Sequence, residues 1–248
     1  ELSGKTALVT GSSEGIGRAI AEALISEGCQ VVVNARNAER LDNCANLIGA
    51  AAAVVGDLSK PAEARHVVDE TLKALGRLDI LICNVGSGSS VPPGEESYEE
   101  WQRVFALNLW STTSAIESAL EALTVSRGVV VCISSICGLE VVPGAPVTYS
   151  SAKAALHAYV RGIARPLGKK GVRINAVAPG NVLSNGSVWA RKLAEDEGAV
   201  QNMLERDVAL GRLATPKEVA ELVAYLASAR ADFATGGVWT LDGGQVHS

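Results

Sequence analysis

The sequence predicts an α/β fold in which helices cover both faces of a seven-stranded parallel sheet. Two observations lead to this class. Short runs rich in Val, Ile and Leu alternate along the chain with longer stretches of helical spacing, which is the pattern of repeated strand-helix-strand units. Most of the short runs are also almost continuously apolar, as expected for strands that helices cover on both sides.

Each predicted strand is one of these short apolar runs. In chain order the strands lie at Thr6–Thr10, Gln30–Asn34, Ala52–Gly56, Ile80–Cys83, Gly128–Ile133, Arg173–Val177 and Val238–Leu241. The predicted helices occupy the periodic stretches between them, at Ile16–Glu27, Ala38–Ile48, Pro61–Leu75, Tyr98–Leu123, Thr148–Leu167 and Pro216–Ala227. Gly28, Gly76 and Gly168 directly follow three of these stretches, where glycine commonly caps a helix.

The 248 residues read as a single domain, residues 1–248, because no linker, internal repeat or low-complexity segment divides them. The core of a chain this long needs no metal or disulfide to stabilise it. The least regular part runs from Asn181 to Asp207. A long segment of this kind inside a compact domain commonly has a function, so we expect residues 182–207 to cover the substrate.

Composition excludes several other classes of protein. The net charge is -5, and no basic run exceeds Lys169-Lys170, which argues against nucleic acid as a partner. The apolar stretches are too short to span a membrane, and the opening residues lack the features of a secretory signal peptide. We therefore expect a cytoplasmic protein without disulfides among its five cysteines. The three histidines do not pair with cysteines at ligand spacing, so no metal site is expected.

A glycine-rich turn follows the first strand and opens the first helix. Its sequence is Thr10-Gly11-Ser12-Ser13-Glu14-Gly15-Ile16-Gly17. Backbone amides and the helix dipole at such a turn form an anion site, and the glycines let a pyrophosphate approach closely. Tight turns also use glycine, but the strand before and the helix after favour dinucleotide binding.

The Gly-x-x-x-Gly-x-Gly spacing resembles the signature of the short-chain dehydrogenase/reductase family. Further motifs stand in the family's order: Asp57-Leu58, Asn84-Val85-Gly86, Asn108, Ser134-Ser135, Tyr149-Ser150-Ser151-Ala152-Lys153 and Pro179-Gly180. The resemblance extends from Gly4 to Gly244 and is strongest to the classical group that includes 3-oxoacyl-carrier-protein reductases. It implies a three-layer α/β/α Rossmann fold with a doubly wound sheet, and an oxidoreductase acting on CH-OH or C=O groups.

The turn after the second strand bears on the choice of cofactor. Ala35 stands where the family's NAD-dependent members carry Asp, and the cation of Arg36 suits the 2'-phosphate of NADP. The resemblance therefore predicts NADP(H), although Arg36 could instead be a solvated surface residue. NAD(H) stays possible, because a carboxylate at Glu14 would repel that phosphate. The residues that the resemblance assigns to the cofactor are Gly11, Ser12, Ser13, Gly15, Ile16, Gly17, Asn34, Arg36, Asp57, Leu58, Asn84, Gly86, Tyr149, Lys153, Pro179, Gly180 and Val182.

Tyr149 and Lys153 stand four apart in a predicted helix and so share one face. A cation beside a phenol lowers its pKa and favours the phenolate. By resemblance, Tyr149 exchanges a proton with the carbonyl oxygen, Ser135 hydrogen-bonds that oxygen, and Lys153 holds the nicotinamide ribose. Asn108 would position a water, or else serve as a core amide bonded to backbone. Ser134 competes with Ser135 but is expected to be a strand-end residue.

Three functional hypotheses follow. The leading one is an NADP(H)-dependent reductase or dehydrogenase of a small-molecule ketone or secondary alcohol, with a 3-oxoacyl thioester as one substrate and a sugar derivative or small ketone as the alternative. The second is a non-catalytic nucleotide sensor on the same fold. The third, a purely structural subunit, does not explain the phosphate turn. The resemblance also implies a homotetramer in which the strand containing Trp239 meets its symmetry mate.

Overall fold

The computed structural model describes residues 2–247, so residues 1 and 248 of the predicted domain lie outside the described residues. It contains the predicted seven-stranded sheet, in the order β3-β2-β1-β4-β5-β6-β7. Every pair of neighbouring strands is parallel. The strands are β1 (Thr6–Val9), β2 (Gln30–Ala35), β3 (Ala52–Val55), β4 (Ile80–Cys83), β5 (Val129–Ile133), β6 (Arg173–Pro179) and β7 (Val238–Leu241).

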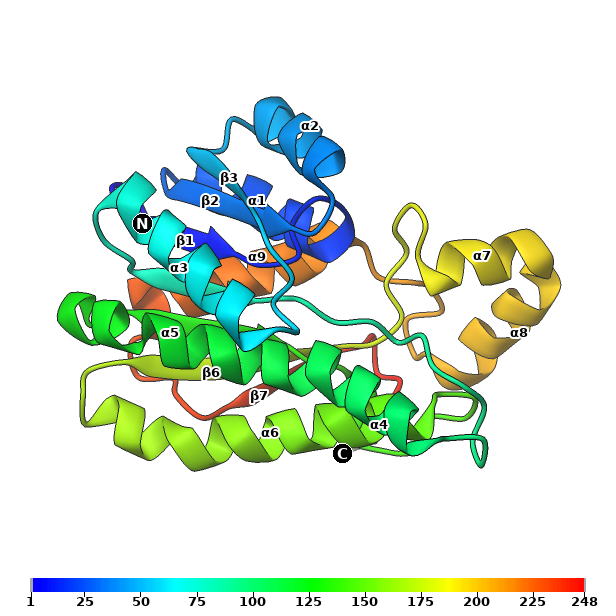
Figure 1. Cartoon of the computed structure of the whole chain (residues 1–248). Coiled ribbons are helices and arrows are strands. Elements are labelled where there is room, and N and C mark those ends of the chain that lie inside the picture. The colour runs from blue at the N-terminus through cyan, green and yellow to red at the C-terminus, as the bar shows by residue number, and fades with distance from the viewer. Residues whose placement is uncertain (1, 248) are drawn as a thin grey trace.

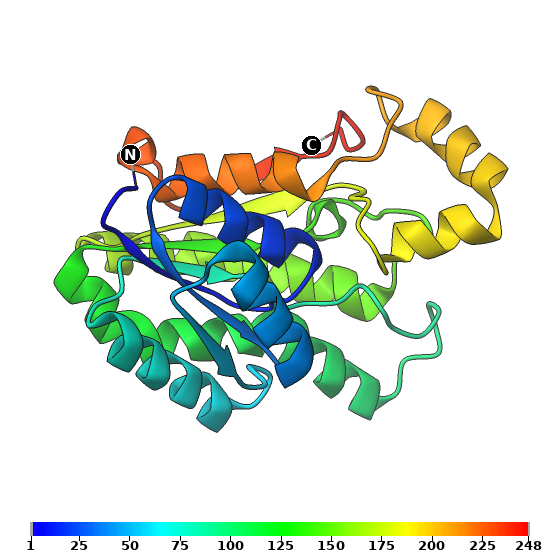
Figure 2. The same cartoon turned by 90° about the horizontal axis from the view of Figure 1, so that it is seen from above.

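Helices form a layer on each face of this sheet, as Figures 1 and 2 show. One layer consists of α1 (Gly15–Ser26), α2 (Ala38–Ile48) and α9 (Pro216–Ala227), and the other of α3 (Pro61–Leu75), α5 (Ser111–Ser126) and α6 (Val147–Gly168). Side chains alternate along a strand, so each strand feeds two separate cores. In β1, for example, Val9 packs in the core beneath α1 and α9, while Leu8 packs in the core beneath α3 and α5. The three-layer, doubly wound prediction is confirmed.

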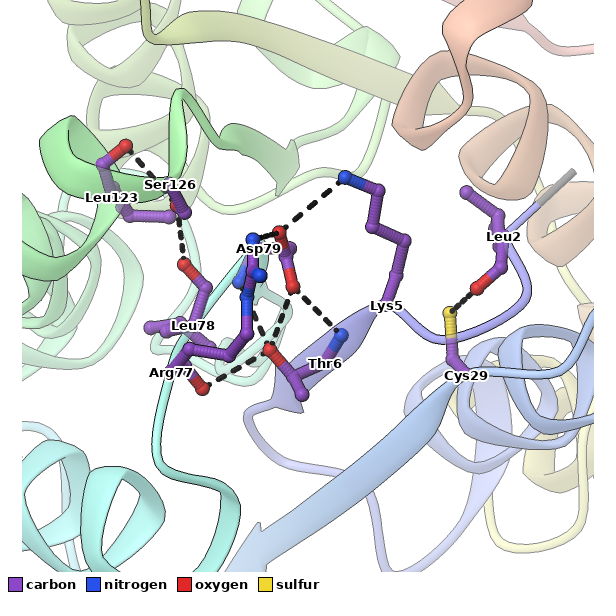
Figure 3. Close-up of polar contacts among 9 residues, drawn as sticks. All are labelled: Leu2, Lys5, Thr6, Cys29, Arg77, Leu78, Asp79, Leu123 and Ser126. Carbon is purple, nitrogen blue, oxygen red and sulfur yellow. Dashed lines mark hydrogen bonds and ion pairs between the residues drawn. The ribbon is translucent and has the colours of Figure 1, made fainter.

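Asp79 fastens the amino-terminal ends of β1 and β4 to each other (Figure 3). Its carboxylate accepts hydrogen bonds from the backbone N–H of Thr6 at 3.1 Å and from the Thr6 hydroxyl at 2.9 Å. Lys5 and Arg77 also contact it. Burial opposes the charge, but these hydrogen bonds hold the pKa of Asp79 below its usual value. This ionic cluster lies at the end of the sheet opposite the carboxyl ends of the strands.

The predicted helix Tyr98–Leu123 is in fact interrupted. The chain forms α4 (Tyr98–Phe105), a π-helical segment at Ala106–Trp110, and then α5, which continues to Ser126. The Asn108 side chain donates to the carbonyl of Val104, four residues earlier, at 3.0 Å. An α-helix would offer that carbonyl to a backbone N–H, so the amide side chain replaces part of the regular ladder. Hydrophobic periodicity alone does not reveal that a side-chain amide takes the place of a backbone N–H here.

One further expectation about elements was wrong. Gly168 does not cap α6, because the helix includes it, and the left-handed backbone occurs later, at Gly171. The segment expected to be least regular contains two helices, α7 (Val188–Glu195) and α8 (Glu197–Asp207). Their N-caps Ser187 and Asp196 each accept a backbone hydrogen bond. By contrast, Gly76 caps α3 in the left-handed conformation, and Gly28 follows α1 with a φ of 92°.

The two helices α7 and α8 project from the layered body beside the sheet (Figure 1). They share a small apolar cluster of their own, built on Val200, Leu204 and Val208. Within residues 2–247, no helix is both long and apolar enough to cross a membrane. The cysteines at 29, 44, 83, 132 and 137 are all free thiols.

Candidate active site

The carboxyl ends of the strands meet at one edge of the sheet, and a cavity of about 430 Å³ opens there. It lies where the chain order reverses, since β1 is flanked by β2 and by β4. Such a reversal is the usual ligand crevice of a doubly wound sheet. The predicted cofactor residues that line this cavity are Gly11, Ser13, Asn34, Arg36, Asp57, Leu58, Asn84 and Gly86.

The glycine turn adopts a backbone that side chains would block. Gly11 and Gly15 have φ values of 61° and 58°. A Cβ on Gly17 would lie 2.3 Å from the Gly11 carbonyl oxygen and 2.4 Å from the Asn84 amide nitrogen. The start of α1 can therefore pack tightly beneath the turn only without a side chain at position 17. Ile16 lies partly buried in the core on that face.

Two predicted cofactor residues use their side chains to fix this turn. The Ser12 hydroxyl is buried and donates to the Val9 carbonyl at 2.7 Å. The Asn34 amide is also buried, and it donates to the carbonyls of Val54 and Gly56. Asn34 thus ties the ends of β2 and β3 together. Both side chains hold the cavity wall in shape.

Asp57 lines the cavity and also shapes its own loop. Its Oδ1 accepts hydrogen bonds from the backbone N–H of Ser59 at 3.0 Å and from the Ser59 hydroxyl at 2.8 Å. The N–H of Asp57 donates to the Glu63 carboxylate at 2.6 Å. The turn role considered for Asp57 from the sequence is therefore present, together with a position on the cavity wall.

Besides Asp57, three charged side chains line the cavity. Arg36 and Glu14 were singled out from the sequence, and the structure adds Arg40. The Arg40 Nη1 lies 3.7 Å from the Glu14 Oε2, and both side chains are exposed. Arg40 lies in the first turn of α2, at the edge of the sheet where β2 ends. The predicted helix Ala38–Ile48 contained the signal for this position at the sheet edge, but nothing in the sequence showed the contact with Glu14.

Asn84 and Gly86 continue the wall after β4. The Asn84 amide donates to the carbonyls of Thr10 at 3.0 Å and Gly11 at 2.8 Å, so it supports the glycine turn from below. A Cβ on Gly86 would lie 2.8 Å from Asn108 Oδ1 and 3.2 Å from Lys153 Nζ. Only a glycine leaves room for these two polar groups to approach the loop.

Tyr149, Lys153 and Ser135 converge beyond this wall. Both α6 residues lie on one face of the helix, and the Lys153 Nζ is 5.8 Å from the centre of the Tyr149 ring. Lys153 is buried and donates to the Ile133 carbonyl at the end of β5, at 2.9 Å. Ser135 follows two residues later and hydrogen-bonds the Tyr149 phenol. Three of the four predicted catalytic groups thus meet where β5 ends against α6.

Burial controls the ionisation of this pair. It raises the pKa of Tyr149 to about 12, although the hydrogen bond from Ser135 acts in the opposite direction. Burial likewise lowers the pKa of Lys153 to about 8. The lowered tyrosine pKa expected from the nearby cation therefore does not occur in the protein alone. At neutral pH the phenol is protonated and the ammonium is charged.

Asn108 is buried in the π-helical segment, and both the nitrogen and the oxygen of its side-chain amide form hydrogen bonds with backbone groups. Its Nδ2 donates to the carbonyl of Ser87 at 3.1 Å, and its Oδ1 accepts from the Ser87 N–H at 3.0 Å. This matches the core amide considered from the sequence. The same bonds hold the start of the serine-rich loop, residues 87–93, beside Lys153.

A second anchor holds that loop over Tyr149. The Ser90 hydroxyl donates to the Glu100 carboxylate at 2.6 Å and lies 2.7 Å from the hydroxyl of Thr148. Hydrogen bonds from Arg103, and then from Ser90, lower the pKa of Glu100 to about 2. The serine-rich loop is therefore pinned to α4 and to the start of α6. Sequence reasoning did not identify Glu100 or Thr148.

The remaining predicted residues follow β6. Pro179 ends that strand, and a Cβ on Gly180 would lie 2.8 Å from the Cβ of Asp242. Val182 is buried and pairs with Ala214 in an isolated bridge. Beyond it, the Ser184 hydroxyl lies 3.4 Å from the position a Cβ would take on Gly15. The segment leading into α7 therefore passes over the glycine turn.

Known proteins of similar sequence and structure span nearly the whole chain. A family model described as enoyl-(acyl carrier protein) reductase matches residues 11–246. Glucose 1-dehydrogenase 2 of Bacillus subtilis (strain 168) is 34% identical over 99% of this chain and 96% of its own length. The rhamnolipids biosynthesis 3-oxoacyl-(acyl-carrier-protein) reductase of Pseudomonas aeruginosa is 34% identical over 98% and 96%. The L-sorbose reductase of Gluconobacter frateurii, solved with NADPH and L-sorbose, has a TM-score of 0.93 and 29% identity over 99% and 98%.

Proposed function

The chain belongs to the short-chain dehydrogenase/reductase family, and we propose that it transfers hydride between NADP(H) and a ketone or secondary alcohol. The convergence of Tyr149, Lys153 and Ser135 at the end of β5 is the observation that carries this proposal. Such a group suits a reaction in which a proton must reach a carbonyl oxygen as negative charge develops there.

The cavity suits the adenosine half of a dinucleotide. Gly11 and Gly86 line the cavity, and neither carries a side chain that would keep a ligand from the backbone. The α1 N-terminus and the turn amides would hold the pyrophosphate, and Asp57 and Asn84 would flank the adenosine. When bound, the cofactor supplies or accepts the hydride at its nicotinamide ring. Pro179, Gly180 and Val182 would form the wall for that ring.

Charge at the rim favours NADP(H) over NAD(H). Ala35 leaves no carboxylate for a ribose hydroxyl, and Arg36 offers a cation to the 2'-phosphate. Arg40 lies against Glu14 and offsets the repulsion expected from that carboxylate. The sorbose reductase, a structural relative, was solved with NADPH. NAD(H) would bind more weakly, because it lacks the phosphate that the arginines would contact.

In the reductive direction Tyr149 donates its proton to the carbonyl oxygen. Its raised pKa keeps the proton available at neutral pH. Ser135 stabilises the same oxygen by a hydrogen bond, and Lys153 binds the nicotinamide ribose and favours the phenolate once the proton has left. Asn108, between Lys153 and the serine-rich loop, would hold the water that returns a proton from solvent.

We propose a 3-oxoacyl thioester as the substrate, which is supported by the relative named for that reaction. A sugar-derived carbonyl is the second candidate. The serine-rich loop supports it, because hydroxyl groups line the approach to Tyr149, and two relatives are named for sugar substrates. In either case residues 182–207 would cover the substrate. The free thiols are consistent with work in the reducing cytoplasm.

A carbonyl panel tests the proposal. The purified chain is offered NADPH, or NADH in parallel, with an acetoacetyl thioester, simple ketones and keto-sugars, and cofactor oxidation is followed by absorbance. We expect turnover with NADPH on the acetoacetyl thioester. Turnover on keto-sugars alone would replace the thioester by the second candidate. Binding of NADPH without turnover of any carbonyl would contradict the reductase and favour a nucleotide sensor.

A further inference from the structure

A third side chain follows Tyr149 and Lys153 on the same face of α6. His157 stands one helical turn beyond Lys153, and each of the three residues contacts the chain at the last residue of β5 or just after it. Tyr149 meets Ser135, Lys153 meets the carbonyl of Ile133, and His157 meets Ser134. The mechanism above uses the first two contacts and leaves His157 without a role.

His157 is 2% exposed, and both of its ring nitrogens have partners. Its Nε2 lies 2.6 Å from the Ser134 hydroxyl, and its Nδ1 lies 3.1 Å from the carbonyl oxygen of Gly138. A carbonyl only accepts, so Nδ1 carries the proton of the neutral ring. Nε2 is then the acceptor, and Ser134 donates to it. The direction of both hydrogen bonds is fixed by the chemistry of the groups.

These two contacts bracket Ser135. Ser134 immediately precedes it, and Gly138 closes the single turn, Ile136–Gly138, that Ser135 caps through the N–H of Cys137. A Cβ on Gly138 would lie 2.6 Å from the carbonyl carbon of Lys153, so the turn is pressed directly against α6. One imidazole therefore fastens both ends of the segment that carries the oxygen-binding hydroxyl.

We propose that His157, acting through Ser134 and Gly138, is the positioning residue that holds Ser135 in line with Tyr149. The inference rests on the proposed function, because it concerns the placement of the serine that function uses. Ser134 thereby has a role of its own: it is the donor of the pair, in addition to ending the strand. A serine aligned by a buried hydrogen-bond pair needs no rearrangement when charge develops on the substrate oxygen.

The order of the turn can be measured without any substrate. Cys137 lies within the turn and is partly exposed, whereas the other four cysteines are buried, so a thiol reagent reports on the opening of this segment. We expect Ser134→Ala, which removes one hydrogen bond, to accelerate labelling of Cys137 by about fivefold or more, and His157→Phe, which removes both, to accelerate it at least as much. His157→Gln, whose amide can donate to Gly138 and accept from Ser134, should restore slow labelling. Cys137→Ser gives the background rate.

The matched control removes a buried hydroxyl far from the site. Thr71 in α3 is fully buried and donates to the Val67 carbonyl at 2.7 Å. Thr71→Val should leave the labelling of Cys137 at the wild-type rate. Unchanged labelling in both His157→Phe and Ser134→Ala would overturn the inference, whatever the chain does with carbonyls. Labelling that changes in a chain without turnover would count against the proposed function alone.

Kinetics separate positioning from general support of the fold. In the wild-type background, His157→Phe should lower kcat about tenfold or more while NADPH affinity stays the same. In a Ser135→Ala background the same substitution should have almost no further effect, because there is no hydroxyl left to position. An equal loss of kcat in both backgrounds would overturn the inference, since a merely structural role does not depend on Ser135.

Discussion

At the adenine end of the cavity, single charges decide which cofactor binds. Arg36 is exposed on the rim, and it is the residue on which the NADP(H) proposal depends most. We predict that Arg36→Ala lowers kcat/KM for NADPH by about tenfold or more, which corresponds to loss of a charge-assisted hydrogen bond to phosphate. The value for NADH should change little. Parallel steady-state kinetics with the two cofactors measure both.

The control for Arg36 is an exposed arginine away from the cavity. Arg65 in α3 fits, and Arg65→Ala should leave both cofactors unaffected. An equal loss for NADPH and NADH in Arg36→Ala would mean that Arg36 supports the loop and does not read the phosphate. The charges predicted from the sequence at this end of the cavity did not include Arg40. Only the fold brings the first turn of α2 beside Glu14.

His157 makes stability depend on pH. Burial, and then the nearby charges of Arg161 and Lys153, lower its pKa from 6.5 to about 4 despite the hydrogen bond to Gly138. The unfolded chain therefore binds more protons than the folded chain between these pH values. The contribution of neutral His157 to the free energy of unfolding is fully present above pH 6.5. It is lost as the pH falls toward 4, by up to about 3 kcal/mol.

We predict that His157→Gln flattens this acid limb, because glutamine does not titrate. Denaturant unfolding at a series of pH values between 7 and 4, with the slope compared between wild type and variant, measures the effect. The exposed His66 supplies the control, and His66→Gln should keep the wild-type slope. An unaltered slope in His157→Gln would show that His157 is not held neutral.

At the scale of the element, the room available for a side chain at each helix position determines which residues the helix tolerates. Gly17 lies in the first turn of α1, directly beneath the glycine-rich turn, where a Cβ would meet backbone atoms of Gly11 and Ser12. We predict that Gly17→Ala destabilises the chain by about 1–3 kcal/mol, the usual cost of overpacking. Gly162 lies exposed within α6 with nothing near the position of its Cβ. Gly162→Ala should therefore stabilise the chain by up to about 1 kcal/mol.

Urea denaturation of the two alanine variants beside wild type checks this pair. Destabilisation by both substitutions to the same degree would mean that helix propensity and local space do not govern these positions.

Most elements could be predicted from the sequence because buried strands and amphipathic helices have distinct periods. The exceptions have local causes. The Asn108 side chain replaces part of a regular hydrogen-bond ladder. The helices α7 and α8 are short, with 8 and 11 residues, and begin at the N-caps Ser187 and Asp196.

At the scale of the whole molecule, β7 is one of the two edge strands of the sheet and bears the partly exposed Trp239. An exposed edge with an aromatic side chain is a natural surface for self-association. We predict a homotetramer, with light scattering giving about four times the chain mass of 25.6 kDa. A mass of one chain at micromolar concentration would contradict it. Trp239→Lys should shift the wild-type assembly toward smaller species.

The chain order also explains why the site was largely predictable. Most of the motifs directly follow a strand, and parallel strands place all their carboxyl ends at one edge of the sheet. The exceptions are Asn108 and the pair Tyr149 and Lys153, which lie on helices. The sequence does not show which side chains lie within hydrogen-bond distance of one another. The bonds of Glu100 to the serine-rich loop, of Arg40 to Glu14 and of His157 to Ser134 join positions far apart in the chain or depend on rotamers, so no spacing rule reveals them.

The central claim is that Tyr149 is the proton donor of an NADP(H)-dependent carbonyl reductase, and Tyr149→Phe tests it most directly. NADPH oxidation on the best carbonyl of the panel should fall by about a hundredfold or more. NADPH affinity, measured by fluorescence titration, should stay within about twofold of wild type, because phenylalanine keeps the ring that packs at the site. Turnover by Tyr149→Phe at the wild-type rate would contradict the account.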